Sequence, residues 1–319
     1  MELKNIIKTL KSIKNPLEFR KFIFSKLISI IYRENKGFYV LNENWDNLII
    51  LDACRFDFFK TIIKRSNIDG KLESRISRGA HTTSFLTQNF KGKKCDDLIY
   101  ITANPYVDKL FEGNFYKIVS IWKDGWNEKY HTVLPETVYQ YSLNIIKNFP
   151  KKRIIIHFMQ PHYPYINTDI ELTTLESLRE STLQNTPKIN DKLKKARFKE
   201  KFWALYSYYV YKMLDVDTHI KGYWKNLQLT FPYVEKIVKL LPGTTIITAD
   251  HGEAFGEYIH PWIPIRYYGH RKGVRIPILT KVPWFIVNPE TSTDKDKQDL
   301  IEKEILRNKI TKLKIKGDI

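Results

Sequence analysis

Acidic residues and a histidine follow two apolar runs that lie far apart in the sequence. The run 245–247 leads into Asp250 and His251, and the run 48–51 ends in Asp52. Short β-branched apolar runs are typical of buried strands, and open α/β sheets bind ligands at the carboxyl ends of their strands. Carboxylate and imidazole groups together can hold a divalent cation. The pattern therefore predicts a metal site at these strand ends, against the simpler alternative of polar loops.

A hydroxyl-rich segment could supply a nucleophile to such a site. Residues 77–86 combine the flexible Gly79 with the neighbouring hydroxyls of Thr82, Thr83 and Ser84. A serine or threonine hydroxyl is a weak nucleophile until a base or a cation favours its alkoxide. Hydroxyl residues are also common in helix caps, so the segment by itself leaves both interpretations open.

Two further apolar runs and the helical patterns between them indicate how these residues are positioned. The run 153–158 contains His157 and leads to His162 between two prolines, whereas the run 98–103 ends in a polar turn without obvious ligands. Helical patterns separate the runs and include residues 135–147 and 233–241. Strands that alternate with helical crossovers are typical of an α/β protein with a mainly parallel central sheet.

In their order along the chain, five sequence segments resemble the alkaline phosphatase superfamily, specifically its sulfatase-like branch. They are residues 51–57, the segment around Thr82, residues 157–165, residues 249–253, and residues 268–270 with 282–285. The resemblance spans residues 47–287. It implies a three-layer α/β/α sandwich with a mainly parallel central sheet, and a metal-dependent ester hydrolase or transferase.

The resemblance also implies a divalent metal: one ion, with room for a second, drawn from zinc, manganese, calcium or magnesium. The ligands of the first ion would be Asp52, Thr82, Asp250 and His251. His162 stands where two-metal relatives have an aspartate. We therefore expect His162 and His270 to bind substrate or to protonate the leaving group, with a second metal between them as the alternative.

Thr82 is the expected nucleophile, with Thr83 and Ser84 as alternatives, because Gly79 precedes it and the bulky Phe85 follows three positions later. True sulfatases resemble Cys-x-Pro-Ser-Arg here, and this chain has no cysteine at the corresponding point. A threonine instead resembles phosphodiesterases, nucleotide pyrophosphatases and lipoteichoic acid synthases. Phosphate mono- and diesters are thus favoured over sulfate esters, with a phosphothreonine intermediate. A sulfatase and a catalytically silent basic binding protein are the alternatives.

Several neighbours of these motifs have two interpretations each. Arg55 could hold a substrate anion or pair with a nearby carboxylate. His157 could bind substrate or a metal, or be a satisfied strand histidine. Glu253 and Glu257 are expected to orient His251 or nearby loops.

Two other features look like site residues but have simpler explanations. Residues 215–219 carry the Asp-x-x-x-His spacing of the second-metal site in two-metal relatives, but the segment around His162 already fills that slot. We interpret them as a helix surface or cap. Cys54, close to Asp52, is interpreted as a small buried residue rather than as a thiol nucleophile.

The composition limits the partners of the 319-residue chain. Its formal net charge of +18 favours anionic partners. Lysine is abundant throughout, however, and no zinc-finger spacing, RNA-recognition motif or sustained basic block is present. Specific nucleic-acid binding is not expected. The expected partner is an anionic ester substrate such as a glycolipid or a polymer-linked phosphate. Two cysteines without CxxC spacing imply no disulfide framework.

One catalytic domain is expected over residues 39–290, with an insertion at about 166–222. Residues 1–38 predict a basic amphipathic helical extension, which suits either packing on the domain or association of residues 1–36 with an anionic membrane surface. Residues 291–319 predict a charged C-terminal helix. No signal-peptide pattern and no transmembrane run is recognised, so a cytoplasmic location, peripheral to a membrane, is expected.

Overall fold

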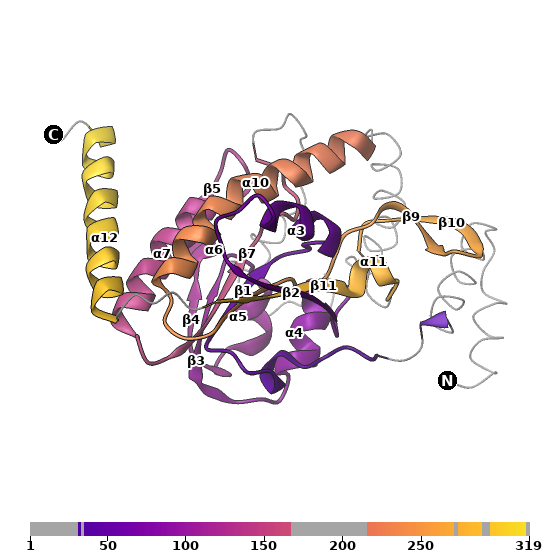
Figure 1. Cartoon of the computed structure of the whole chain (residues 1–319), viewed down its shortest axis with the longest axis horizontal. Coiled ribbons are helices and arrows are strands. Elements are labelled where there is room, and N and C mark those ends of the chain that lie inside the picture. The colour runs from indigo at the N-terminus through magenta and orange to yellow at the C-terminus, as the bar shows by residue number, and fades with distance from the viewer. Residues whose placement is uncertain (1–30, 33–34, 167–215, 271–273, 289–293, 317–319) are drawn as a thin grey trace, which may run out of the picture.

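A central β-sheet organises the chain in this computed structural model, which describes residues 31–32, 35–166, 216–270, 274–288 and 294–316 (Figure 1). Within these residues the sheet has seven strands. Their order is β2 (Gly70–Ile76), β11 (Lys281–Val287), β8 (Thr245–Thr248), β1 (Asn47–Leu51), β7 (Arg153–Phe158), β3 (Cys95–Thr102) and β4 (Phe115–Ser120). The five strands from β8 to β4 pair in parallel, and β11 runs antiparallel to both of its neighbours.

Helices cover both faces of this sheet. One face carries α3 (Phe56–Ile63), α7 (Pro135–Asn148), α10 (Val216–Leu240) and α12 (Asp294–Lys316). The other face carries α4 (Thr82–Phe90) and α5 (Tyr106–Phe111) (Figure 1). The predicted three-layer α/β/α sandwich with a mainly parallel sheet is therefore confirmed.

The alternation of side chains in β1 explains why the sheet is buried on both faces. Ile49 and Leu51 join the core under α3, α7 and α10, whereas Leu48 and Ile50 join the core under α4 and α5. All four are fully buried. A strand that is apolar at every position is what a parallel sheet covered on both sides requires.

Short elements complete the described structure. They are η1 (Val40–Asn42), α6 (Ile121–Asp124), β5 (Trp126–Asn127), β6 (Thr132–Val133), α11 (Pro277–Thr280), and a separate hairpin of β9 (Phe255–His260) and β10 (Ile263–Tyr268). Among the described helices, none is both long and apolar enough to cross a membrane.

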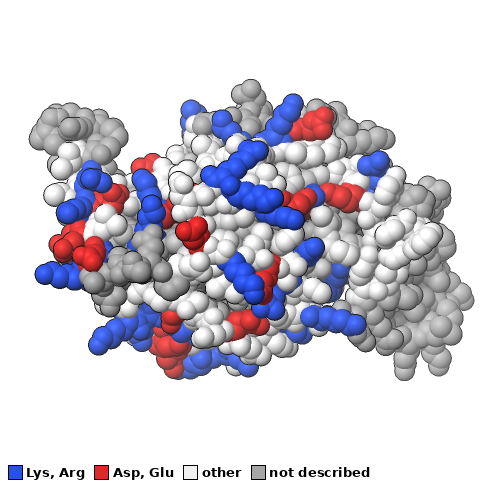
Figure 2. Space-filling view, viewed as in Figure 1, with Lys and Arg blue, Asp and Glu red and all other residues white. Residues whose placement is uncertain are grey.

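The predicted extensions are described only in part. Most of residues 1–38 and of the expected insertion lie outside the described residues, so the predicted domain boundaries stay predictions. The C-terminal helix is present as α12, with Ile301 fully buried in the core. Figure 2 shows basic and acidic side chains interspersed over one face of the molecule, as expected for a charge that is spread along the whole chain.

Candidate active site

The strands β8, β1 and β7 are neighbours and deliver the predicted acidic residues at one edge of the sheet. Asp52 follows β1 and Asp250 follows β8, and both side chains are buried. The backbone N–H groups of Ala53 and His251 donate to Oδ1 of Asp250, at 3.0 and 2.9 Å. The side-chain amide of Asn104, after β3, donates to Oδ2 of Asp52 at 2.9 Å. Within the described structure, Oδ1 of Asp52 and Oδ2 of Asp250 have no hydrogen-bond partner.

His251 turns an unprotonated nitrogen toward these carboxylates. Its Nδ1 lies 2.8 Å from the carbonyl oxygen of Gly252, which can only accept, so Nδ1 carries the proton and Nε2 the lone pair. Nε2 lies 3.3 Å from Oδ2 of Asp250 and 3.6 Å from Oδ1 of Asp52. Burial, followed by the nearby His270, lowers the pKa of His251 well below its ordinary value. The imidazole is therefore neutral, the form that binds metals.

Thr82 is the first residue of α4, and its hydroxyl faces the same cluster. Its Oγ1 lies 3.3 Å from Nε2 of His251 and 3.4 Å from Oδ2 of Asp52. The helix begins here because His81 is its N-cap, with a reciprocal capping box to Ser84. The side chain of Thr82 is 6% exposed, so it is held at the floor of the site rather than in a loop.

The two alternative hydroxyls are occupied elsewhere. The hydroxyl of Thr83 lies 3.0 Å from Nδ1 of His81. The hydroxyl of Ser84 donates to the carbonyl of His81 at 2.8 Å and accepts from the N–H of Ala80 at 3.1 Å. Of these three hydroxyls, that of Thr82 lies within hydrogen-bonding distance of the predicted metal ligands.

The spacing of the cluster fits a cation between its members. The closest contacts among Asp52, Thr82, Asp250 and His251 are 3.3–3.6 Å, longer than the usual charge-assisted hydrogen bond. Ligand atoms with bonds of about 2.1 Å to one tetrahedral zinc ion lie about 3.4 Å apart. Burial and the carboxylate of Asp250 raise the pKa of Asp52 well above its ordinary value. Both observations fit a cation held between these residues.

His157 borders this cluster from within β7. It is fully buried, and its Nδ1 lies 3.0 Å from the hydroxyl of Tyr100 on β3. Its Nε2 has no hydrogen-bond partner in the described part of the chain and lies 3.6 Å from Oδ2 of Asp52. Atoms of Asp52, His157 and Asp250 lie close enough together to hold a metal ion. Burial lowers the pKa of His157 to about 4, so it is a neutral candidate ligand at pH 7.

Gly252 is required in the Asp-His-Gly sequence by close packing. A Cβ at this position would lie 2.2 Å from the carbonyl oxygen of Ile278. The N–H of Gly252 also donates to the carbonyl of Leu279 at 2.8 Å. The segment that carries Asp250 and His251 is thus packed against the backbone of α11.

His162 and His270 meet beside the cluster, with Glu253 behind them. The Nε2 atoms of the two histidines lie 3.3 Å apart, and Nδ1 of His270 lies 2.7 Å from Oε2 of Glu253. The ring centroids of His270 and His251 are 4.4 Å apart. The structure therefore brings both predicted substrate-binding histidines next to the predicted metal ligands. Glu253, expected to orient His251 or nearby loops, contacts His270 through its carboxylate.

The charges of this group follow from Glu253. Burial opposes charge on His270, but the carboxylate of Glu253 outweighs burial and raises the pKa of His270. Glu253 responds in the opposite sense: burial would raise its pKa, but His270 and then His162 lower it. His162 itself has a lowered pKa because of burial and the neighbouring His270. The arrangement favours an imidazolium at His270 beside a neutral His162. Atoms of His162, Glu253 and His270 are also close enough to hold a second cation.

Arg55 is engaged by carboxylates. Its guanidinium forms two hydrogen bonds with Asp57, at 3.0 and 2.7 Å, and another with Glu257. Arg55 is only 7% exposed. This geometry supports the structural interpretation of Arg55 over a contact with substrate.

Of the remaining sequence candidates, His219 and Cys54 are buried outside the cluster of carboxylates and histidines. Asp215 lies outside the described residues. His219 lies in α10, but it is buried there rather than on the helix surface, with its Nδ1 3.4 Å from the hydroxyl of Tyr165. Cys54 is fully buried, and burial raises the pKa of its thiol well above the ordinary value. A thiol of this kind is unreactive, as predicted for Cys54.

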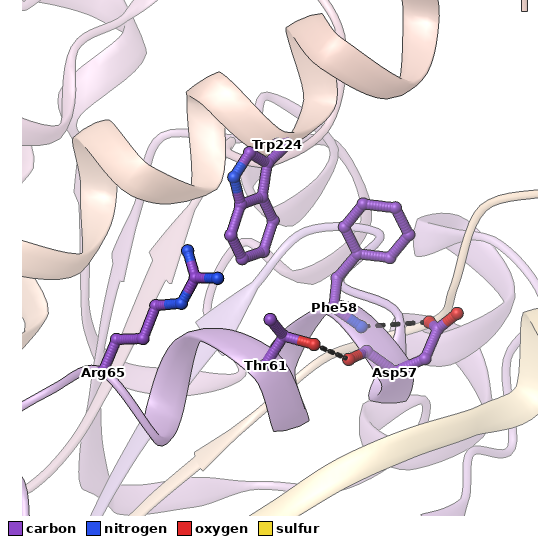
Figure 3. A pocket seen from close by; sticks show the side chains of 5 residues that line it. All are labelled: Asp57, Phe58, Thr61, Arg65 and Trp224. Carbon is purple, nitrogen blue, oxygen red and sulfur yellow. Dashed lines mark hydrogen bonds between the residues drawn. The ribbon is translucent and has the colours of Figure 1, made fainter. Parts of the chain in front are cut away.

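A surface cavity of 340 Å³ lies between α3 and α10 (Figure 3). Its lining consists of Asp57, Phe58, Thr61, Arg65 and Trp224. The guanidinium of Arg65 lies 5.7 Å from the ring centroid of Trp224. None of the lining residues belongs to the cluster of carboxylates and histidines, so the chemistry is assigned to the cluster and not to this cavity.

Sequence reasoning missed Asn104 and Tyr100, which touch the predicted ligands. Asn104 follows the run at 98–103, where no ligand was recognised. An amide after a strand carries no distinctive signal. Tyr100 lies inside that run and resembles any other core residue.

Comparison with known proteins gives structural matches alone, since no protein-family model and no curated protein matches the sequence. The chain is similar to the C-terminal periplasmic domain of EcEptC from Escherichia coli in complex with Zn (14% identity, TM-score 0.47, covering 82% of this chain and 76% of that one). It is similar to a protein in the alkaline phosphatase superfamily from Vibrio parahaemolyticus (12%, 0.41, 77% and 60%). It is also similar to the lipoteichoic acid synthase LtaP from Listeria monocytogenes (9%, 0.39, 85% and 72%).

Proposed function

We propose that this protein is a metal-dependent phosphate ester hydrolase or phosphotransferase that uses Thr82 as its nucleophile. One observation carries the proposal: among three adjacent hydroxyls, Thr82 alone contacts the buried cluster of Asp52, Asp250 and His251. Unpartnered carboxylate oxygens and a neutral imidazole are the donor set that a divalent metal such as zinc takes.

The residues that would hold the metal are Asp52, Thr82, Asp250 and His251, with His157 adjoining them. A bound divalent cation would favour the deprotonated form of the Thr82 hydroxyl and offset negative charge on the phosphoryl group. The position of Thr82 at the N-terminus of α4 adds to this effect. The unsatisfied N–H groups of a helix N-terminus favour negative charge nearby.

In the first proposed step, the alkoxide of Thr82, whose hydroxyl proton has already passed to solvent, attacks phosphorus through Oγ1. A bond forms between Oγ1 and phosphorus, and the bond between phosphorus and the leaving oxygen breaks. The leaving oxygen takes a proton from the His162–His270 pair, where Glu253 keeps His270 protonated. General acid catalysis of this kind lowers the barrier to loss of an alkoxide.

In the second step, water or an acceptor alcohol attacks the phosphothreonine. A new bond to phosphorus forms, the bond to Oγ1 of Thr82 breaks, and the proton of the attacking group goes to the same histidine pair. Water makes the protein a hydrolase and an alcohol makes it a transferase.

The proposed substrate is an anionic phosphodiester carried by a glycolipid or a polymer, which the net charge of +18 would attract. Residues 1–36 are proposed to hold the protein at an anionic membrane surface on the cytoplasmic side. Vesicle co-sedimentation of the full chain and of a chain without residues 1–36 tests this part. Equal binding of both chains would remove residues 1–36 from the proposal.

The activity itself is tested by turnover of nitrophenyl phosphate monoesters, phosphate diesters and sulfate esters in the presence of zinc, manganese, calcium or magnesium. We expect metal-dependent release of nitrophenol from the phosphate esters. Faster turnover of the sulfate ester would replace the proposal with a sulfatase. A protein that binds no metal and turns over none of these esters would be a catalytically silent relative.

A further inference from the structure

The hairpin of β9 and β10 extends from the body of the molecule as a separate two-stranded sheet (Figure 1). Its strands pair antiparallel, with His260 opposite Ile263 and Tyr258 opposite Arg266. Trp262, in the turn between the strands, is 88% exposed, the highest value among the exposed large apolar side chains of the described structure. Burying such an apolar side chain is favourable, so a tryptophan exposed at a hairpin tip is a candidate contact surface.

The base of the hairpin is fixed, so the exposure of its tip does not reflect a loose loop. Ile259 and Tyr267 are buried and pack with Val274, Ile276 and other residues near α11. The hydroxyl of Tyr32 also donates to the carbonyl of Ile259 at 2.7 Å. The hairpin therefore presents Trp262 on a rigid support.

The hairpin also carries features of a lipid–water boundary. Tyr258 is 53% exposed, and the guanidinium of Arg266 lies 5.1 Å from its ring centroid. Within β9 and β10 the one acidic residue, Glu257, is paired with Arg55, and the basic residue is Arg266; residues 258–288, which follow Glu257, contain no aspartate or glutamate. Aromatic side chains with basic neighbours are the groups enriched at the surface of anionic membranes.

The hairpin grows directly out of the candidate active site. Glu253 lies two residues before β9 and His270 two residues after β10. The contact between these two side chains, at 2.7 Å, joins the two ends of the hairpin at its base. A surface that binds the tip would therefore face the same end of the molecule as the histidine pair.

We propose that the tip of the β9–β10 hairpin inserts Trp262 into the surface of an anionic lipid bilayer, with Arg266 facing the lipid headgroups. A protein partner is disfavoured because an isolated tryptophan with basic neighbours offers little shape for a specific interface, whereas a bilayer requires only depth and charge. That membrane binding delivers a lipid-linked phosphodiester to Thr82 rests on the proposed function. The membrane contact itself is independent of that function.

Co-sedimentation with vesicles tests the contact, using phosphatidylcholine alone and phosphatidylcholine mixed with phosphatidylglycerol. We expect the full chain to bind the mixed vesicles, and Trp262→Ser to weaken that binding on the order of ten-fold. Tyr116→Ser is the matched control, because Tyr116 is 49% exposed on β4, outside the hairpin, and should leave binding unchanged. Equal binding of Trp262→Ser and the unaltered chain would overturn the proposal.

Insertion is measured separately by quenching of tryptophan fluorescence with lipids brominated along the acyl chain. Quenching should fall in Trp262→Phe, which keeps an apolar tip, while vesicle binding persists. Unchanged quenching in this variant would show that Trp262 stays in water and would refute insertion.

Thr82→Ala should bind vesicles like the unaltered chain, so loss of catalysis and loss of membrane contact are distinguished. Turnover of a soluble nitrophenyl ester should be the same in Trp262→Ser.

Discussion

The hydroxyl of Thr82 lies 3.3 Å from Nε2 of His251, although the two residues are 169 positions apart in the chain. The N-terminus of α4 supplies the first, and the end of β8 supplies the second. Asp52, from the end of β1, touches both. Three separate elements thus converge on one point, where the proposed nucleophile meets the proposed metal ligands.

Replacing Thr82 tests the nucleophile. Thr82→Ala should reduce turnover of a phosphate ester on the order of 10³-fold or more, because no other hydroxyl of the segment contacts the cluster. Bound metal, measured by elemental analysis, should decrease much less, since three ligands persist. Thr83→Ala is the matched control and should retain most activity, because that hydroxyl contacts His81 instead. Full activity in Thr82→Ala would falsify the assignment.

Replacing Asp250 tests the metal site. Asp250→Asn should lower the metal content of the purified protein, because an amide presents a neutral oxygen in place of the unpartnered carboxylate oxygen. The exposed Asp96 provides the control, and Asp96→Asn should bind metal normally. Dialysis against a chelator should abolish turnover, and zinc or manganese should restore it. Unchanged metal content in Asp250→Asn would exclude this residue as a ligand.

Tyr100 offers a test of how His157 takes part. Tyr100→Phe removes the hydroxyl that contacts Nδ1 of His157 and should weaken metal affinity roughly ten-fold, as loss of a hydrogen bond to a ligand does. His157→Leu should weaken it further if Nε2 contacts the metal. Competition with a chromogenic chelator measures both values. Affinities equal to that of the unaltered protein would make His157 a core residue without a role at the site.

The sequence predicts those elements whose residues show a clear hydrophobic pattern. Strands such as β1 and β7 are continuous apolar runs, because they are buried on both faces, and β1 and β7 were predicted at residues 48–51 and 153–158. The edge strand β2 was not predicted, since its sequence Gly-Lys-Leu-Glu-Ser-Arg-Ile is mostly polar and its burial is only partial. Edge strands need little apolar surface and therefore leave little trace in a sequence.

The candidate site divides in the same way. Asp52, Asp250 and His251 could be predicted because they follow strands whose ends must meet. The contact between Glu253 and His270 could not, because a hairpin with an irregular register separates them. The choice among Thr82, Thr83 and Ser84 also required the structure, since only the start of α4 decides which hydroxyl faces inward.

The pair of Glu253 and His270 predicts the pH dependence. The folded-state pKa of His270 is raised above its ordinary value by Glu253, so the stability it contributes is full below about pH 6.5 and is lost as the pH rises through the raised value. The pKa of Glu253 is lowered, so its contribution is lost only as the pH falls through that lowered value. Because the proposed first step takes a proton from the His162–His270 pair, kcat/KM should fall on the alkaline side as His270 loses its proton.

Glu253→Gln should move this alkaline midpoint to lower pH, because the neutral amide no longer favours the imidazolium. The measurement is kcat/KM against pH, together with the NMR titration of the His270 ring. The control is Glu112→Gln, at an exposed position outside the site, which should leave the midpoint in place. A midpoint that is identical in Glu253→Gln would show that another group controls the profile.

Gly252 links the stability of the fold to the metal site. In Gly252→Ala the new Cβ would meet the carbonyl oxygen of Ile278 at 2.2 Å, and backbone cannot yield as a flexible side chain does. We expect a loss of about 1–3 kcal/mol in the free energy of unfolding, the usual cost of overpacking. Metal affinity should fall too, since Asp250 and His251 must shift with the segment. Denaturant unfolding and chelator competition measure the two effects.

Gly92 serves as the comparison, because it has a φ of +72° and no atom near its missing Cβ. Gly92→Ala should cost about 1–2 kcal/mol from backbone strain alone and leave metal affinity unchanged, so equal metal affinities in the two variants would separate Gly252 from the site.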